Sequence, residues 1–337
     1  MRELALADVT AMPKVELHVH LDCSLSLAAV QAIAPGTSAE NYNERFLAPQ
    51  KCVDLLDYFR HIEPAIALLQ SRQALRIATL DLLAQFDADN VLYAEIRFAP
   101  QIHTNQGLSV ADVVAVVSDA ISEGRAKYSV VARLILCVLR FDDAEMGRQL
   151  VALARGNDLV TGIDLAGDEV GYPLDAHVTT FAGARDVGLG LTAHAGEAGG
   201  ADKVSEVVSR LGVSRVGHGV RAIEDSALMA RLAESKVHLE VCPSCNVQID
   251  VYPELASHPV EKLVRAGLSV GINTDARGVT ALTLSEQYLR LNQTFGWTAS
   301  DFAARNRDAL AYAFIGDELR SKLMSQFSIS HFQAGQK

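Results

Sequence analysis

The chain has 337 residues, of which 49% are hydrophobic and 21% charged, a composition typical of a folded globular protein. Thirty basic and 41 acidic residues give a formal net charge of -11, so the surface repels nucleic-acid phosphates and anionic lipids. We therefore expect no nucleic-acid partner and no membrane partner, whereas the charge does not exclude a small neutral ligand.

The amino-terminal segment, MRELALADVTAMPK, lacks the apolar core of a secretory signal. The longest apolar run, YSVVARLILCVLRF, is interrupted by Arg133 and is shorter than the roughly 20 residues that span a bilayer. The chain has five cysteines, an odd number that cannot all pair within one chain. These features predict reduced thiols and a cytoplasmic location.

Eight apolar runs, each typical of a parallel strand buried on both faces, alternate with stretches of helical periodicity. The runs are residues 15–22, 92–100, 132–140, 160–167, 189–197, 215–219, 237–243 and 268–275. Eight strands that alternate with helices predict an α/β fold, a (β/α)8 TIM barrel. A doubly wound open sheet is the weaker alternative, because no glycine-rich phosphate turn follows the first strand.

The segment between the first two predicted strands is too long for a single crossover. It runs from about Leu25 to Asp89, and the stretch 53–70 within it has a helical pattern. We expect extra helices inserted after the first strand, covering one mouth of the barrel. No linker, repeat or low-complexity tract divides the sequence, so residues 1–337 are expected to form a single domain.

Polar side chains gather at the carboxyl ends of the predicted strands, where barrels of this type carry their active sites. His18 and His20 are two residues apart, so they point to the same side of a strand, and buried imidazoles need polar partners. Together with His194 and Asp275 they form a donor set that suits a divalent transition metal, above all Zn²⁺. Other strand ends supply Asp22, Asp164, Gly167, Asp168, Glu197, His218, Glu240 and Cys242.

The remaining histidines lack such company, and we expect them at the surface or in packing roles. They are His61, His103, His177, His238, His258 and His331. Cys242 and Cys245 form a C-x-x-C motif, which could indicate redox chemistry. The motif closes a strand rather than opening a thioredoxin-like helix, so buried or loop thiols are the favoured interpretation.

The order of these motifs resembles the adenosine deaminase family of the amidohydrolase superfamily. The matching segments are PKVELHVHLD, YAEIRFAP, GIDLAGDE, TAHAGE, RVGHGV, EVCPSCN and GINTDA, spread across nearly the whole chain. The resemblance implies a (β/α)8 barrel with one zinc ion per chain. It also implies hydrolytic deamination of a 6-aminopurine nucleoside, such as adenosine to inosine and ammonia or the same reaction on 2'-deoxyadenosine. A purine nucleoside is then the expected partner.

The resemblance also implies roles for individual residues. The implied zinc ligands are His18, His20, His194 and Asp275. Glu197 matches the proton donor to purine N1, and His218 the residue beside the attacking water, which it can deprotonate or stabilise electrostatically. Asp275 can orient that water.

Substrate contacts are implied in the same way. His20 and Asp22 match positions that contact the ribose, and the backbone N–H of Gly167 matches one that faces purine N3. Leu55 and Phe59 match the apolar lid over the base.

Two positions depart from the family pattern. Many members carry a second aspartate that reaches purine N7, where this chain has Ala276, so Arg277 is a candidate substitute donor. Cys23 follows Asp22 where a smaller residue is commoner, which would crowd the ribose end. A deaminase of adenine, 6-aminodeoxyfutalosine or an N6-substituted adenosine shares every catalytic residue and is the alternative function.

Other classes of protein fit the sequence less well. A binuclear hydrolase is disfavoured because the fourth strand end, IDLAGDE, has no bridging lysine. The zinc cytidine-deaminase class expects H-x-E with P-C-x-x-C, whereas this chain has H-A-G-E and C-P-S-C. A non-catalytic nucleoside sensor would be expected to have lost Glu197 or a metal ligand, and neither is missing.

Overall fold

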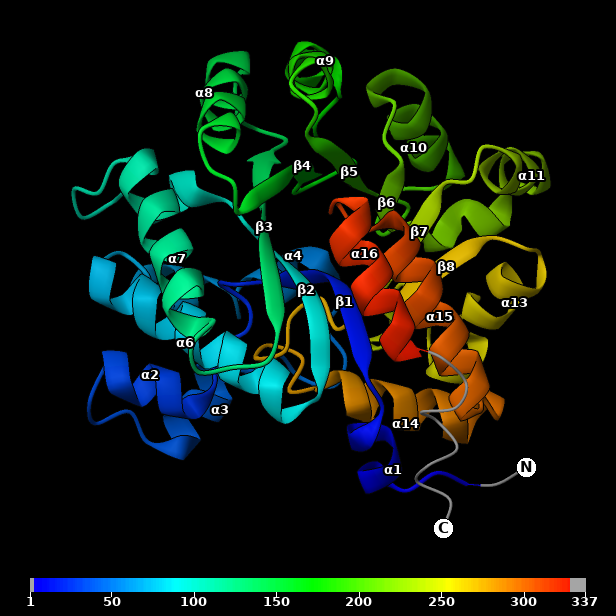
Figure 1. Ribbon diagram of the computed structural model, residues 1–337, viewed down its shortest axis with the longest axis horizontal. Coiled ribbons are helices and arrows are strands. Elements are labelled where there is room, and N and C mark those ends of the chain that lie inside the picture. The colour runs from blue at the N-terminus through cyan, green and yellow to red at the C-terminus, as the bar shows by residue number, and fades with distance from the viewer. Residues whose placement is uncertain (1–2, 328–337) are drawn as a thin grey trace.

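The computed structural model describes residues 3–327. Eight parallel strands are hydrogen-bonded in chain order from β1 to β8 (Figure 1). This order confirms the predicted (β/α)8 barrel, because a doubly wound sheet would place later strands on both sides of the first. The strands are β1 Lys14–His20, β2 Val91–Phe98, β3 Val131–Leu139, β4 Val160–Ala166, β5 Gly190–Ala195, β6 Arg215–His218, β7 His238–Val241 and β8 Ser269–Ile272.

Helices surround the strands on all sides (Figure 1). In chain order they are α1 Leu6–Ala11, α2 Leu27–Ile33, α3 Ala39–Phe46, α4 Leu55–Phe59, α5 Glu63–Leu68, α6 Arg72–Ala88, α7 Val110–Gly124, α8 Ala144–Arg155, α9 Val178–Asp186, α10 Ala201–Glu206, α11 Ser226–Glu234, α12 Pro243–Gln248, α13 Val260–Arg265, α14 Leu284–Phe295, α15 Ala299–Tyr312 and α16 Asp317–Met324. None of the helices within residues 3–327 has both the length and the apolar character needed to cross a bilayer.

Helices α2 to α6 lie between β1 and β2 in the chain, which confirms the predicted insertion. The helical pattern of residues 53–70 forms two short helices, α4 and α5, rather than one. Pro64 explains the break, because it lies in the first turn of α5, and proline is tolerated in a first turn but not inside a helix.

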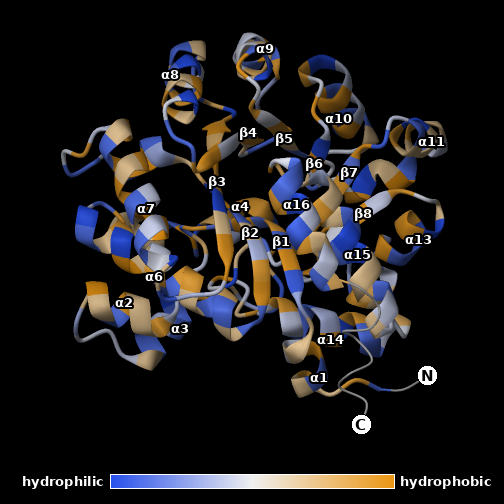
Figure 2. Ribbon diagram, viewed as in Figure 1, coloured by the Kyte–Doolittle hydropathy of each residue, from blue (hydrophilic) through white to orange (hydrophobic). Residues whose placement is uncertain are grey.

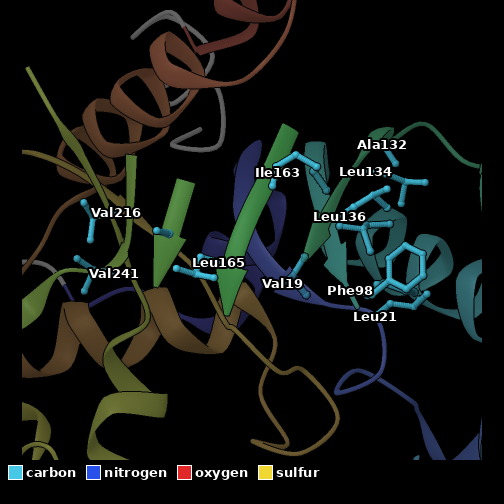
Figure 3. Packing of buried hydrophobic residues seen from close by; sticks show 14 of the residues in the cluster. Val19, Leu21, Phe98, Ala132, Leu134, Leu136, Ile163, Leu165, Val216 and Val241 are labelled. Atoms are coloured by element: carbon cyan, nitrogen blue, oxygen red, sulfur yellow. The ribbon is translucent and has the colours of Figure 1, made fainter. Parts of the chain in front are cut away.

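The apolar core lies between the outer face of the barrel and the surrounding helices. Figure 2 shows apolar residues along β1 and β2 and a mixture of polar and apolar residues on the helices. Strand residues that pack outward include Val19, Phe98, Leu134, Leu136, Ile163, Leu165, Val216 and Val241 (Figure 3). This core contributes the hydrophobic stabilisation and leaves the barrel interior free for polar groups.

Many of the inward-pointing side chains are charged. Glu95 and Arg97 on β2, Asp164 on β4, Arg215 on β6 and Glu240 on β7 are each 0% exposed. Arg97 lies 3.0 Å from Asp164 and 2.6 Å from Glu240, and Arg215 lies 2.6 Å from both Glu95 and Glu240. Each buried charge therefore has an opposite charge beside it, which offsets the free energy of removing it from water.

The side chain of Asn273 joins the two ends of the sheet, β1 and β8. Its Oδ1 accepts hydrogen bonds from the N–H of Leu17 at 2.8 Å and of His18 at 3.0 Å. Just beyond, the N–H of Asp275 donates to the oxygen of His18 at 3.0 Å, and the N–H of His20 donates to the oxygen of Asp275 at 2.7 Å. The closure of the barrel thus fixes His18, His20 and Asp275 relative to one another.

We predict that Asn273→Ala lowers the free energy of unfolding by about 2 to 4 kcal/mol, because it leaves two buried N–H groups without an acceptor. Denaturant unfolding monitored by circular dichroism measures the change. Asn43→Ala on the exposed face of α3 is the control and should lie within about 0.5 kcal/mol of the parent. Equal stabilities of the two variants would contradict a role for Asn273 in closing the barrel.

Candidate active site

A cavity of about 290 Å³ opens at the carboxyl ends of the strands. Its walls are mostly apolar, with Ile102, Leu139 and Phe141 on one side and Leu55 and Phe59 of α4 on another. Leu55 and Phe59, which the resemblance implies as part of an apolar lid, therefore line the cavity. The polar residues that line it are His20, Asp22, Glu63, His194, Glu197, His218 and Asp275.

His18, His20, His194 and Asp275 lie together, with one donor atom of each within 4.8 Å of the others. Three of them, His20, His194 and Asp275, line the cavity. Nε2 of His20 is 3.2 Å from Nε2 of His194. Oδ1 of Asp275 is 3.1 Å from Nε2 of His18 and 3.4 Å from Nε2 of His20. The structure thus brings together all four residues that the sequence suggested as metal ligands.

Two buried carboxylates orient two of these imidazoles. Nδ1 of His18 lies 2.9 Å from Glu240, and Nδ1 of His194 lies 3.0 Å from Asp164. Arg97 bridges the two carboxylates, so one guanidinium supports both imidazole contacts. Because an ionised carboxylate only accepts hydrogen bonds, each Nδ1 carries its proton and each Nε2 presents a lone pair toward the cavity floor.

This arrangement fits a metal ion. Nε2 of His18 is buried and makes no hydrogen bond within the described part of the chain, although Oδ1 of Asp275 lies 3.1 Å from it. Burial, the largest influence, lowers the pKa of His20 to about 3, so its imidazole is neutral and can act as a ligand. The imidazole lone pairs converge on a carboxylate oxygen with no proton between them, and a bound cation would stabilise this arrangement. Three imidazoles with one carboxylate suit zinc.

Glu197 lies on the loop after β5, at the edge of the metal-ligand set. Burial and then the negative charges of Asp275 and Glu169 raise the pKa of Glu197 well above its ordinary value, which favours its protonated form. Glu169 holds this loop, because it accepts hydrogen bonds from the N–H groups of Gly196 at 2.9 Å, Glu197 at 2.9 Å and Gly199 at 2.7 Å. The arrangement presents a neutral carboxylic acid to the cavity.

His218 ends β6 and faces Glu197, with 3.4 Å between its Nε2 and Oε1 of Glu197. Its backbone has a φ of 59°, and Asp275 has a φ of 67°. Residues with side chains adopt this left-handed region at a cost in free energy and are concentrated at functional sites. The neighbouring Gly217 gives room for the imidazole of His18, because a Cβ there would lie 2.9 Å from Cε1 of His18.

The residues expected to contact substrate line the same cavity. His20, Asp22 and Gly167 are all in its wall. Gly167 has a φ of 97°, which exposes its peptide in a way that favours glycine. His103 lies 3.3 Å from Asp22 and holds this carboxylate. Cys23 lines the cavity beside Asp22, with its Sγ 3.6 Å from Oδ1 of Asp22.

The structure corrects the expectation for Arg277. Its guanidinium is buried, contacts Glu16 at 2.5 Å and Asp89 at 2.9 Å, and lies over the ring of Phe86. It points away from the cavity and cannot replace an aspartate at purine N7. Ala276 itself lines the cavity, so a methyl group stands where the family resemblance implied a second aspartate.

The expectations for the other histidines hold in part. His103, His177, His238 and His258 are all buried, so their roles are internal and not at the surface. His61 is half-buried, and His331 lies outside the described residues. His103 was missed as a site residue, although IRFAPQIH places it just after a strand end. The sequence contains a stronger indication for Arg97 than for His103. Two charged residues in a predicted buried strand, Glu95 and Arg97 in EIR, indicate ion-pair partners inside the barrel.

Asp168 and Asp164 differ in their partners. Asp168 accepts hydrogen bonds from the N–H groups of Val170 and Gly171, as expected of a residue that satisfies backbone amides. Asp164 instead binds the side chains of Arg97 and His194. All five cysteines are free and buried, so Cys242 and Cys245 form no disulfide, in line with the favoured interpretation of that motif.

Known proteins match both the sequence and the fold. The family model described as adenosine deaminase matches residues 13–329. The adenosine deaminase of Enterococcus faecalis is 35% identical over 326 residues, which cover 94% of this chain and 96% of that protein. The adenine deaminase of Arthrobacter aurescens has a TM-score of 0.86 at 27% identity, covering 94% of this chain and 98% of that one. A zinc-bound amidohydrolase of Burkholderia ambifaria has a TM-score of 0.87 at 25% identity, covering 100% and 95%.

The barrel, its buried donor set and these similarities define an aminohydrolase that acts on carbon–nitrogen bonds. The chain belongs to the adenosine deaminase family. Its relatives support aminopurine deamination as its reaction, and its donor set, together with the zinc-bound relative, supports a metal ion.

We predict that Asp164→Asn weakens metal affinity about 10- to 100-fold, because the carboxylate that orients His194 is lost. Competition with a chelator measures the affinity without any substrate. Asp142→Asn is the control, since Asp142 accepts hydrogen bonds from Leu139 and Gln101 and does not contact the metal ligands. An unchanged affinity in Asp164→Asn would rule out this support for the ligand.

Proposed function

We propose that this chain is a zinc-dependent deaminase of 6-aminopurine nucleosides, with adenosine and 2'-deoxyadenosine as substrates and inosine or its deoxy form, plus ammonia, as products. The observation that carries the proposal is a buried acid, Glu197, held beside His218 at the edge of four converging metal donors. The reaction needs an activated water at purine C6 and a proton donor at the adjacent ring atom N1. The cavity offers residues for both.

His18, His20, His194 and Asp275 would hold the metal, one ion per chain. Zinc, when bound in such a set, supplies a water activated for attack at neutral pH. The zinc-bound relative from Burkholderia ambifaria supports the identity of the metal. Asp275 presents Oδ1 to His18 and His20 and can orient the attacking water beside them.

Glu197 would act on the purine ring. Attack at C6 pushes electron density toward N1, and a protonated Glu197 donates a hydrogen bond or proton to that nitrogen. The dry surroundings of Glu197 keep the acid neutral before the reaction. General acid catalysis of this kind contributes about 10²- to 10⁴-fold in rate.

The charges of the cavity favour a nucleoside over a nucleotide. Within residues 3–327, the cavity wall carries the carboxyl groups of Asp22, Glu63, Glu197 and Asp275 and no lysine or arginine. A phosphate ester would bring two negative charges into this surface without a basic side chain to bind them. Asp22, by contrast, is held by His103 and can accept a hydrogen bond from a ribose hydroxyl.

Adenine is the second candidate substrate. The adenine deaminase of Arthrobacter aurescens shares the fold over 98% of its length, and the catalytic groups would act on a free base as well as on a nucleoside. The two candidates differ in their use of Asp22, because adenine has no ribose to contact it. The buried free thiols support a cytoplasmic location for either activity.

The test is turnover of adenosine, 2'-deoxyadenosine, adenine and AMP by the purified zinc-loaded protein, followed by the ultraviolet change as the amino group is lost. We expect the nucleosides to react, with AMP at least about 100-fold slower in kcat/KM because of charge repulsion. If adenine alone is turned over, the free base and not the nucleoside is the substrate. No turnover of any of the four would overturn the proposal.

Glu197→Gln tests the acid within the same assay. It should keep about one zinc per chain by metal analysis and lose about 10²- to 10⁴-fold in kcat. Glu63→Gln is the matched control, because Glu63 is exposed at the cavity wall and should change kcat by less than about threefold. Near-normal activity of Glu197→Gln would remove Glu197 from the mechanism.

A further inference from the structure

A chain of hydrogen bonds runs behind His218, away from the cavity. It begins at the N–H of Val260, in the first turn of α13, which donates to Nδ1 of His258 at 3.1 Å. Nε2 of His258 lies 3.2 Å from Oδ1 of Asn246. Nδ2 of Asn246 lies 3.1 Å from Nδ1 of His218.

The proton positions along this chain follow from its first member. A backbone N–H can only donate, so Nδ1 of His258 accepts and carries no proton. A neutral imidazole has one N–H, so Nε2 of His258 is the donor and the atom of Asn246 that faces it is the carbonyl oxygen. The amide N–H₂ then donates to Nδ1 of His218, which leaves the His218 proton on Nε2.

The reversed orientation of the Asn246 amide is excluded by the same reasoning. It would place a donating N–H₂ against Nε2 of His258, so both ring nitrogens of His258 would have to accept at once. A neutral imidazole has one acceptor nitrogen and an imidazolium has none, so neither can accept at both ring nitrogens. The orientation is therefore fixed by a main-chain N–H outside the cavity.

The surroundings keep the two imidazoles neutral. His258, Asn246 and His218 are 2%, 0% and 1% exposed. Burial lowers the pKa of His258 to about 3. His218 is neutral as well, because its Nδ1 accepts a hydrogen bond from the amide of Asn246 and an imidazolium has no acceptor nitrogen. Neutral rings are the condition under which the hydrogen-bond chain determines the tautomer.

We infer that His258 and Asn246 are positioning residues that hold His218 as the Nε2–H tautomer, so that His218 donates a hydrogen bond to the attacking oxygen and does not remove its proton. Nε2 faces Glu197 and the cavity, where the oxygen that attacks C6 must pass. A hydrogen-bond donor at this position stabilises negative charge on that oxygen in the transition state.

The same tautomer decides between two overlapping sets of metal donors. One set contains His18, His20, His194 and Asp275; another replaces His20 and His194 with His218 and Cys242. With a proton on Nε2 and Asn246 bonded to Nδ1, His218 has no lone pair to offer a metal. The hydrogen bonds through His258 and Asn246 therefore keep His218 from acting as a metal ligand. His218 remains available for catalysis, and the first set holds the metal.

The direct test is the tautomer of His218 in the zinc-loaded protein, read from two-bond ¹⁵N–¹H correlations of ¹⁵N-histidine-labelled protein, with His218→Gln used to assign the signal. We expect Nε2 to have the shift of a protonated nitrogen and Nδ1 that of a hydrogen-bond acceptor. A proton on Nδ1, or on both nitrogens, overturns the inference. This measurement needs no substrate, so it stands even if the proposed function fails.

The kinetic test rests on the proposed function and uses Asn246→Asp. A carboxylate only accepts hydrogen bonds, so it should draw a proton onto Nδ1 of His218, change the tautomer signal and lower kcat for adenosine about 10²- to 10³-fold. KM should change by less than about threefold, because His218 acts on the attacking oxygen. A changed tautomer with unchanged kcat would overturn the catalytic part of the inference.

His177→Phe is the matched control. His177 is another buried histidine with one main-chain hydrogen bond, from its Nε2 to the oxygen of Arg140 at 3.0 Å, and it is not linked to His218. A general effect of losing a buried polar group would lower kcat equally in His177→Phe and His258→Phe. The inference requires that only His258→Phe alter the His218 signal and lower kcat.

Discussion

The placement of Arg97 between two buried carboxylates is the interaction on which the rest of the site depends. Asp164 and Glu240 are both fully buried, and without a cation their mutual repulsion would drive one of them to take up a proton. The protonated carboxyl group could then donate a hydrogen bond to the imidazole above it and would no longer fix the tautomer of that imidazole. By contacting both, and with Arg215 also beside Glu240, Arg97 keeps the two carboxylates ionised. The ionised carboxylates in turn fix the tautomers of His18 and His194, so that their Nε2 lone pairs converge.

This charged layer also explains why the hydrophobic core lies outside the barrel. An ordinary barrel of this kind fills its interior with branched aliphatic side chains. Here the inward positions of β2, β4, β6 and β7 carry ion pairs, and the apolar contacts of the same strands are made with the helices (Figure 3). The stability of the fold and the chemistry of the site therefore use opposite faces of the same strands.

Groups outside the cavity wall also determine where the protons of Glu197 and His218 lie. Glu169 satisfies three N–H groups of the loop that carries Glu197, and its charge helps to keep that acid protonated. The N–H of Val260 acts on His218 through His258 and Asn246. A pre-organised environment of this kind needs little rearrangement when charge develops on a substrate.

The sequence by itself determined the barrel and the inserted helices, and it indicated the four side chains that converge as candidate metal donors. It could do so because strand and helix periodicity are local properties, and because parallel strands in a barrel bring all their carboxyl ends to one mouth. Residues at strand ends, such as His18, His194 and Asp275, are therefore neighbours whatever their separation in the chain. Because of this geometry, the residues that form the site can be inferred from their positions at predicted strand ends.

Only the tertiary structure decided which way the supporting side chains point and what they contact. Arg277 lies two residues after Asp275 in the chain, yet its guanidinium turns toward Glu16 and Asp89, and Ala276 rather than Arg277 lines the cavity beside Asp275. His258 looked like a packing residue, yet its two nitrogens connect α13 to His218. No local pattern encodes such contacts, because they depend on the rotation of each side chain and on partners brought together only when the helices pack around the barrel.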